Sequence, residues 1–560
     1  MARIDSKVIF VTTSPRTPAK MIPEIELLNS NFAGQVWNND TQIAFMELLK
    51  EENFFNGEGA NDPAFSARDR MNRAPKALGF VKLSPKIALT PAGERLVTDK
   101  RKEEVFLRQL LKFQVPSPYH KPSANAADFW VKPYLELFRL IRHFGSLKFD
   151  ELMIFGLQLV NYNNFDEIVE KIDRFRIAKA ENKGSYNKFK TETLKTELLE
   201  IYQSEINTGN TKTRESRDKS IDKFLRTKAS NLHDYADACI RYLRATGLVN
   251  ISHIGRSLSI IPEKTSEVDF FLDKTDRNPC FVDDERQYTD YLGDATLPIL
   301  QTDNKTAVIE KLKNEFPQTS FNKADDIEKL KDLLDDAISE RKEQLIENQV
   351  IEIKDYRCYD DIQNTFKQID DKTIYDPSLM LEWNVWRAMT MLDGGDISAN
   401  LKFDDFGNPM STAQGNMADI VCDYGDFGLT VEVTMAAGQK QYEMEGEPVT
   451  RHLAKFKKST GKPAFCLFVA PTINEACVAH FYALHKMNIS YYGGKSTIIP
   501  LPLSVFRKML EDSYKATYTP EPNQVKRFFE RSNQLVETCD NEQDWFEQIQ
   551  KAALNWLAIR

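Results

Sequence analysis

The chain has 560 residues, of which 28% are charged and 11% aromatic, and its formal net charge is −9 at pH 7. This length exceeds what one hydrophobic core supports and indicates two to four domains, and the composition excludes an intrinsically disordered chain. No apolar run reaches the roughly eighteen residues of a membrane span, and the first twenty residues lack the apolar core and cleavage site of a signal peptide.

The charge is divided unevenly between the two halves of the chain. Residues 1–262 contain 40 Lys and Arg against 32 Asp and Glu, a net charge of +8, so the remainder carries −17. A basic front half suits nucleic-acid binding, although a modest positive excess is common. The seven cysteines form no C-x-x-C pair, which favours reduced thiols in a cytoplasm and argues against a zinc site.

Residues 1–262 are predicted to be mainly helical and to contain two winged helix-turn-helix-like modules. In the first, near residues 60–100, a helix begins at Phe65, a hairpin turns at Ser84-Pro85, and a short helix starts at Pro91. Helix, hairpin and helix is the order of a winged module, which places a helix in the major groove of DNA and its hairpin along the backbone. The DNA-binding candidates here are Arg68, Arg70 and Arg73 on the helix and Lys82 and Lys86 near the wing.

The second module, near residues 225–262, repeats this order. A helix over residues 231–244 precedes a hairpin that turns at His253–Arg256, and Arg256 at its tip is a further DNA-binding candidate. The alternative for both modules is that they pack within the protein and do not touch DNA. The Lys- and Arg-rich residues 179–228 between them are either solvated or follow phosphates.

The acidic residues 263–345 are predicted to be a helical connector. Their longest stretch, residues 324–353, has the apolar spacing of an amphipathic helix. A connector of this kind fits an enzyme that binds with one part and acts at a distance with another, and it has many other uses.

Residues 346–560 alternate predicted strands and helices, which indicates an α/β domain. The apolar run Phe465–Ala470 suits a buried central strand, and prolines in the run Thr497–Leu503 point to a sheet edge. A further helix is expected to begin at Pro448, followed by Arg451 and several lysines that either meet phosphate or are solvated.

Two carboxylates mark this domain. Asp419 and Glu432 flank a turn at Tyr424–Asp426, and two antiparallel strands joined there would bring the carboxylates side by side. Paired carboxylates repel unless a cation lies between them, and hard oxygen ligands suit Mg²⁺. The alternative is that Asp419 caps a turn and Glu432 is a solvated strand residue.

These segments also resemble a known family. Asp419 followed by Glu432-Val-Thr is similar to the core of the PD-(D/E)xK nuclease fold. More specifically, residues 415–419, 431–434, 441–452 and 465–471 resemble the AlwI family of type IIS restriction endonucleases and related nicking endonucleases. The chain departs from the nuclease pattern at Thr434, where a lysine is expected. The resemblance is specific over residues 415–471 and weaker in the first half.

The resemblance implies a division into a DNA-recognition domain at 1–262, a helical linker at 263–345 and a restriction-endonuclease-like cleavage domain at 346–560. It also implies Mg²⁺ as the cofactor, double-stranded DNA as the partner, and a cytoplasmic bacterial restriction-modification system. Cutting both strands would require a homodimer or a small second subunit. The implied catalytic residues are Asp419, Glu432, Glu445, His452 and Glu382, of which Asp419, Glu432 and Glu382 would hold the metal.

Three functions follow from these observations. The first is a sequence-specific type IIS-like endonuclease that hydrolyses phosphodiesters at a fixed distance from a short asymmetric site. The second is a strand-specific nicking endonuclease or the large subunit of a heterodimeric restriction enzyme. The third, from another class, is a winged-helix DNA-binding regulator without catalytic activity. No phosphate-binding G-x-x-x-x-G-K-[ST] or G-x-G-x-x-G motif occurs, so a nucleotide cofactor has no support.

Overall fold

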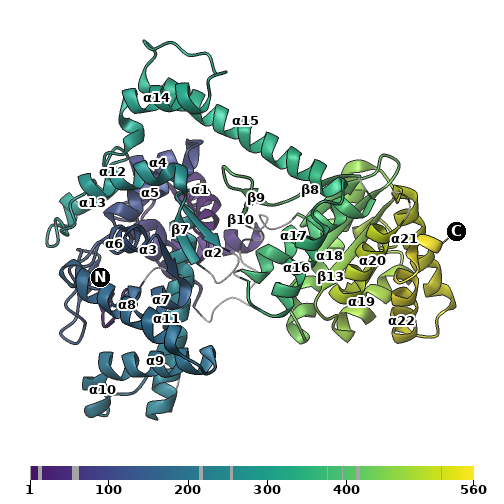
Figure 1. The fold of residues 1–560 in the computed structure, drawn as a ribbon, viewed down its shortest axis with the longest axis horizontal. Helices are drawn as coiled ribbons and strands as arrows, with labels where there is room; N and C mark the ends of the chain where they lie inside the picture. The colour runs from purple at the N-terminus through teal and green to yellow at the C-terminus, as the bar shows by residue number, and fades with distance from the viewer. Residues whose placement is uncertain are drawn as a thin grey trace. The chain divides into compact units, whose positions relative to one another are not determined.

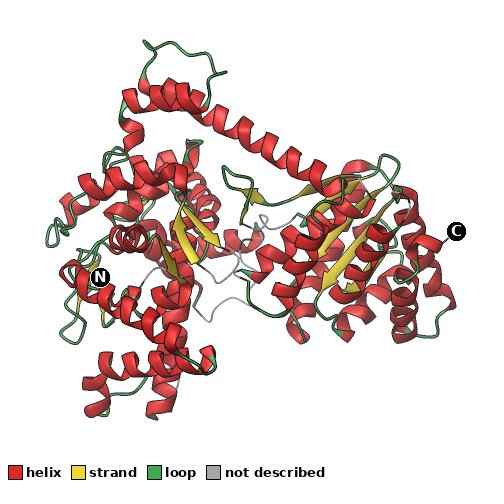
Figure 2. Cartoon of the chain, in the orientation of Figure 1, coloured by secondary structure: helices red, strands yellow, loops and turns green. Residues whose placement is uncertain are grey.

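The computed structural model describes residues 2–10, 15–52, 54, 62–213, 218–252, 257–374, 376–393, 395–411, 417–516, 518 and 520–559. The chain forms two compact units, Met1–Asp335 and Asp336–Arg560. The protein is thus multidomain and mostly helical, with a mixed sheet in its C-terminal half (Figures 1 and 2). None of the described helices combines the length and apolar character that a membrane crossing requires.

The first unit is built from helices with short strand pairs between them. In the first predicted module, helix α3 precedes an antiparallel β2–β3 hairpin and helix α4. In the second, α11 precedes the antiparallel pair β6–β7, and β5 joins that pair as a third strand. The helices are α1 Met21–Phe32, α2 Asn39–Glu51, α3 Pro63–Ala77, α4 Pro91–Thr98, α5 Lys102–Lys112, α6 Pro133–Phe144, α7 Phe149–Ile154, α8 Phe165–Glu181, α9 Tyr186–Ile201, α10 Gln203–Asn207, α11 Ile221–Arg244, α12 Thr265–Lys274, α13 Glu285–Gly293 and α14 Lys305–Glu315. The strands are β1 Ala2–Ile4, β2 Val81–Lys82, β3 Ala88–Leu89, β4 His120–Pro122, β5 Ser146–Lys148, β6 Val249–Ser252 and β7 Ser257–Ile260.

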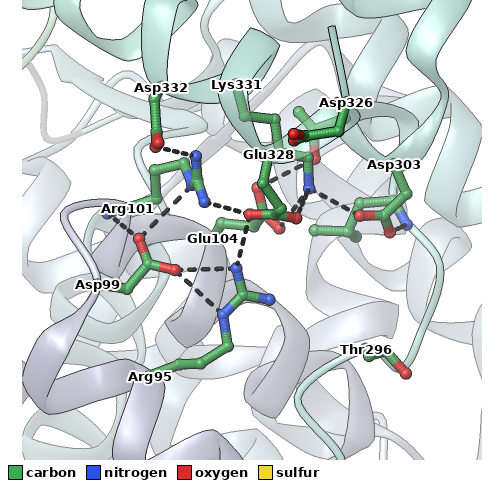
Figure 3. A network of polar contacts seen from close by, with 12 residues as sticks. Arg95, Asp99, Arg101, Glu104, Thr296, Asp303, Asp326, Glu328, Lys331 and Asp332 are labelled. Carbon is green, nitrogen blue, oxygen red and sulfur yellow. Dashed lines mark hydrogen bonds and ion pairs between the residues drawn. The ribbon is translucent and has the colours of Figure 1, made fainter.

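The acidic segment after residue 262 is helical, and residues 263–335 belong to the first unit. Its last helix, α15 Ile327–Lys354, crosses the boundary between the units. An ion-pair network fixes its first turns to the first unit (Figure 3). The buried Lys331 Nζ lies 2.8 Å from Asp303 Oδ1 and 3.3 Å from Glu104 Oε1. Arg101 adds contacts of 2.6 Å to Glu328 Oε2 and 2.8 Å to Asp332 Oδ1.

The second unit contains a five-stranded mixed sheet in the order β14-β13-β12-β11-β8. The strands are β8 Asp396–Ala399, β11 Ile420–Asp423, β12 Gly428–Val433, β13 Ala464–Ala470 and β14 Ile498–Pro502. Strands β12, β13 and β14 are parallel, whereas β11 is antiparallel to both β12 and β8. The prediction of an edge strand is confirmed, because β14 carries Pro500 and Pro502 and lies at one edge of the sheet.

Helices surround this sheet (Figure 2). Helices α17 and α20 pack against each other, as do α18 and α19, and all four contact strands of the sheet. Every residue of β12 is buried, so this strand forms part of the core. The helices are α16 Tyr359–Asp370, α17 Pro377–Asp393, α18 Gln439–Thr460, α19 Glu475–Lys486, α20 Leu503–Lys515, α21 Pro522–Thr538 and α22 Glu542–Ala553, and a small antiparallel pair joins β9 Lys402–Phe403 to β10 Pro409–Ser411.

The expectation that a helix begins at Pro448 is wrong. Helix α18 begins at Gln439 and contains Pro448 in its interior, where the proline ring removes one backbone hydrogen bond. The buried Gln441 side chain holds the first turn, because its amide donates to Ala436 O and Thr472 O at 2.9 Å each. The early start places Glu445 on the helix, seven residues before His452 and on the same face.

Candidate active site

Strands β11 and β12 bring Asp419 and Glu432 together. Ile420 pairs with Val431 in the antiparallel register, so one residue further along Asp419 lies opposite Glu432. The Val433 backbone N–H donates to Asp419 Oδ2 at 2.8 Å, which holds this carboxylate against β12. Glu432 is 4% exposed, so the alternative of a solvated strand residue is wrong.

Helix α17 contributes Glu382 to the same region. The residue is buried, and its Oε2 atom has no hydrogen-bond partner among the described residues. Burial raises the pKa of Glu382 to about 10, with further contributions from Asp419, Glu432 and Glu445. An unpartnered carboxylate oxygen buried among other acids is costly, which makes it unlike an ordinary structural glutamate.

Helix α18 contributes Glu445 and His452 from one face. His452 Nδ1 lies 2.9 Å from Glu432 Oε1, whereas the buried Nε2 has no hydrogen-bond partner among the described residues. Burial, and then the charge of Arg451, lowers the pKa of His452 to about 4. The imidazole is therefore neutral near pH 7, and one hydrogen bond joins its Nδ1 to the Glu432 carboxyl group.

The remaining acids of this group also resist ionisation. Burial raises the pKa of Asp419, and the neighbouring Glu432 raises it further. Burial likewise raises the pKa of Glu432, with Glu445 adding to the effect. The pKa of Glu445 is raised by burial as well. We refer to Glu382, Asp419, Glu432 and Glu445 as the acidic cluster, in which burial raises the pKa of every carboxyl and neighbouring acids add to the shift for Glu382, Asp419 and Glu432.

Thr434 occupies the position where the nuclease pattern has a lysine. Its side chain is buried, its Oγ1 accepts from Ala436 N at 3.1 Å, and a hydrogen bond from its hydroxyl lowers the pKa of Glu445. Thr434 thus connects the end of β12 to the α18 carboxylate. Sequence reasoning missed this contact because Thr434 and Glu445 lie eleven residues apart, across a loop whose path no local pattern predicts.

The donor set of the acidic cluster fits a hard divalent cation, since it consists of carboxylates and includes one buried oxygen without a hydrogen-bond partner. In their present rotamers these side chains bind to Val433 N and His452. Correspondingly, over the part of the chain that the structure describes, no group of three or more His, Cys, Asp or Glu side chains is arranged to hold a metal ion. Metal binding would therefore require rotation of at least one carboxylate.

The predicted DNA-binding arginines of α3 lie in the first unit and contact its own residues. Arg68 Nη1 donates to Gln42 Oε1 at 2.8 Å, and Arg73 Nε lies 2.5 Å from Asp69 Oδ1. Arg70 forms a two-point ion pair with the buried Glu24. This pair uses the Arg70 guanidinium within the unit, whereas the Arg68 and Arg73 side chains are each 39% exposed.

The hairpin candidates lie at the surface. Lys82 on β2 is 3.5 Å from Asp290 Oδ1, and Lys86 is exposed in the turn between β2 and β3. Arg256 lies outside the described residues.

The chain matches the model of one known protein family. A family model described as AlwI restriction endonuclease matches residues 76–509. No curated protein matches the chain.

Three solved structures of restriction enzymes are similar to parts of the chain. The small subunit of the heterodimeric restriction endonuclease R.BspD6I is 24% identical over 34% of this chain and 98% of that chain, with a TM-score of 0.30. The BpuJ1 endonuclease binding domain in complex with modified DNA is 12% identical over 51% of this chain and 97% of that chain, with a TM-score of 0.33. The restriction endonuclease FokI is 11% identical over 85% of this chain and 84% of that chain, with a TM-score of 0.23. All three TM-scores lie below 0.5, so none of these structures defines the fold of this chain.

Proposed function

Since the chain belongs to the AlwI restriction endonuclease family and is a type II site-specific nuclease, we propose that it is a type IIS-like enzyme that cuts DNA at a fixed distance from a short asymmetric site. Residues 1–262 would recognise the site through the two winged modules, residues 263–345 would connect, and residues 346–560 would cut. The protein would act in the cytoplasm of a bacterial restriction-modification system.

The observation that carries this proposal is the acidic cluster. Asp419 and Glu432 would hold Mg²⁺, and Glu382, with its unpartnered oxygen, would complete the ligand set. Mg²⁺ bound there would supply the Lewis acidity that activates a water and steadies the leaving oxygen. Glu445 would position the attacking water, with its own position fixed by Thr434.

His452 would act as a positioning residue. Its Nδ1 lies 2.9 Å from Glu432 Oε1, and with the proton on Nδ1 this contact would fix both the direction of the carboxylate and the orientation of the ring. The free Nε2 lone pair of the neutral ring would accept a proton or a hydrogen bond from water at the cluster.

Recognition would use the exposed basic side chains of the first module. Lys86 in the β2–β3 turn would contact the phosphate backbone, and Arg68 and Arg73 of α3 would reach DNA from partly exposed positions. Lys82 would extend this surface, and Arg256, which lies outside the described residues, remains a candidate from the sequence alone. Arg70 would support it through its ion pair with Glu24.

A test uses a long supercoiled plasmid of mixed sequence incubated with the protein and Mg²⁺. The proposal predicts linear or open-circular products, whereas a winged-helix regulator would leave the plasmid supercoiled. Asp419→Asn keeps the side-chain volume and should bind DNA as the wild type does but not cut it. Cleavage by Asp419→Asn at the wild-type rate would refute the assignment of the site.

A second candidate is a strand-specific nicking endonuclease or the large subunit of a heterodimer. One acidic cluster cuts one strand at a time, so a double-strand break would require a second copy, a small second subunit or reorientation of the enzyme. The same gel distinguishes the two, because a nicking enzyme gives open circles that never become linear. Sequencing the product ends then gives the recognition site and the cutting distance.

A further inference from the structure

The exposed side of α18 carries a row of cations beside the acidic cluster. Arg451, Lys455 and Lys458 recur at intervals of four and three residues, which aligns them along one side of the helix over about 10 Å. Lys455 and Lys458 are exposed, and the Arg451 side chain is 19% exposed. Glu447 is the one acidic residue between positions 446 and 460 of this helix. We call Arg451, Lys455 and Lys458 the cationic row.

The row lies within electrostatic reach of the cluster. Arg451 directly precedes His452, which holds Glu432 at 2.9 Å. Arg451 and Lys455 both contribute to the lowered pKa of His452, after burial, and Arg451 counteracts the raised pKa of Glu432. The positive charges are therefore beside the acids, about a quarter of a helical turn away from the cluster-facing side of α18.

Neighbouring groups hold the Arg451 and Lys458 side chains in place. Arg451 Nε lies 3.1 Å from each carboxylate oxygen of Glu447. Lys458 Nζ donates to Tyr491 O at 2.9 Å and lies 5.6 Å from the centre of the Tyr491 ring, which is 63% exposed. The row is thus an ordered cationic surface that ends at an exposed aromatic ring, and such surfaces suit a nucleic-acid backbone.

We propose that the cationic row binds the phosphates of the strand being cut and thereby brings the scissile phosphate to the acidic cluster. The inference rests on the proposed function and names the part of the substrate that α18 holds. The acidic cluster itself offers no positive charge to a phosphate, so the adjacent cationic row would supply the attraction that brings DNA close. Successive phosphates of one strand advance 3.4 Å along the duplex, so a row of about 10 Å spans about three of them.

The test compares two triple variants of the full-length protein. Arg451→Ala/Lys455→Ala/Lys458→Ala removes the row, and Lys508→Ala/Lys515→Ala/Lys551→Ala removes three lysines from α20 and α22 as a control matched in charge. The cleavage rate is measured below saturation at 50 and 200 mM salt. Since each phosphate contact contributes about 0.9 to the salt slope, the row variant should lose about 2.7 from that slope, and the control variant none. Wild-type cleavage would then fall about 40-fold more than that of the row variant over this salt range.

Neutral methylphosphonates at positions flanking the cut identify the phosphates. A methylphosphonate at a contacted position should slow the wild type and have no further effect on the row variant. Lys455→Ala/Lys458→Ala, which changes two exposed residues only, gives the same comparison if the triple variant folds poorly, with an expected slope change of about 1.8.

The outcomes separate this inference from the proposed function. If Asp419→Asn is inactive while the row variant keeps the salt slope and methylphosphonate response of the wild type, the cationic row is a solvated helix surface and the inference is wrong. If Asp419→Asn cuts like the wild type, the proposed function of the acidic cluster fails first. Equal losses in the row and control variants would show an effect of net charge alone, which also refutes the inference.

Discussion

Glu382→Gln is predicted to stabilise the second unit in the absence of metal while abolishing cleavage. Burial, together with Asp419 and the other acids, raises the pKa of Glu382 from 4.5 to about 10. A carboxyl whose pKa is raised on folding contributes no penalty below pH 4.5, and the penalty grows as the pH rises toward 10. At pH 7, about 2.5 units above the pKa of the unfolded chain, Glu382 ionises in the unfolded chain but not in the folded one. This difference stabilises the unfolded chain by about 3 kcal/mol. Glutamine keeps the shape of the side chain and cannot ionise, so the penalty disappears.

The assay is thermal unfolding in a chelator at pH 5 and pH 8. At pH 8 the same penalty is about 5 kcal/mol, and its removal corresponds to a gain of about 10–20 °C in Tm for a unit of this size. The difference between variant and wild type should be small at pH 5 and large at pH 8. Glu530→Gln removes an exposed carboxylate from α21 and serves as a control. A Glu382→Gln protein that melts at or below the wild-type temperature at pH 8, or a difference independent of pH, would refute the reasoning.

Three further predictions concern the ion-pair network of α15 and the packing and chemistry of the second unit. Lys331→Ala leaves Glu104 and Asp303 short of a partner and should cost about 3–5 kcal/mol, with faster hydrogen exchange in the first turns of α15 as the measurement. His452→Ala frees Glu432 and should slow cleavage about 10- to 100-fold with DNA binding unchanged in a gel-shift assay, whereas loss of binding would contradict a positioning role. Gly428→Ala would place its Cβ 2.1 Å from the Phe456 ring, so chemical denaturation should show a destabilised second unit, and unchanged stability would contradict the close packing of α18 on β12.

The first unit should also lose stability in acid. Although burial favours the neutral form of Glu104, Lys331 and Arg108 lower its pKa below the usual value. Burial also opposes ionisation of Asp303, but the Leu300 N–H, Lys331 and Arg108 together lower its pKa below the usual value. For a carboxylate whose pKa falls on folding, the stabilisation is fully present when the pH lies above the pKa of the unfolded state. It is lost as the pH drops through the pKa of the folded state. The acid-induced loosening of α15 should therefore be weaker in Lys331→Ala, and an equal acid response in both proteins would contradict the network.

The sequence predicted best where a local rule determines the structure. Alternation of apolar and polar residues around a Gly-Asp turn is enough to predict the β11–β12 pair, and its register alone then places Asp419 opposite Glu432. Prolines within an apolar run predicted the edge strand, because a residue without an N–H cannot donate a hydrogen bond to a neighbouring strand.

Prediction failed where tertiary contacts override local preference. Pro448 usually marks the first turn of a helix, yet α18 continues upstream of it because Gln441 binds two backbone carbonyls, one of them from the distant Thr472. Arg70 shares a short basic helix with Arg68 and Arg73, and its pairing with a buried Glu24, forty-six residues away, leaves no trace in local sequence. Such contacts depend on how elements pack, which no spacing rule encodes.

Thr434 stands where the resemblance to the nuclease pattern leads one to expect a lysine, and this difference bears on the electrostatics of the proposed site. A lysine at the end of β12 would place a positive charge among the acids, whereas Thr434 contributes only a hydrogen bond to Glu445. The cation that lowers the pKa of Glu432 instead is Arg451, which lies on the neighbouring helix α18 and contacts Glu447. Burial is the main cause of the raised pKa values of the acids, and a charge that lies beside the cluster and not within it offsets this effect only in part. In the proposed site a bound cation would neutralise the acids, and Arg451 would form part of the basic surface that DNA approaches.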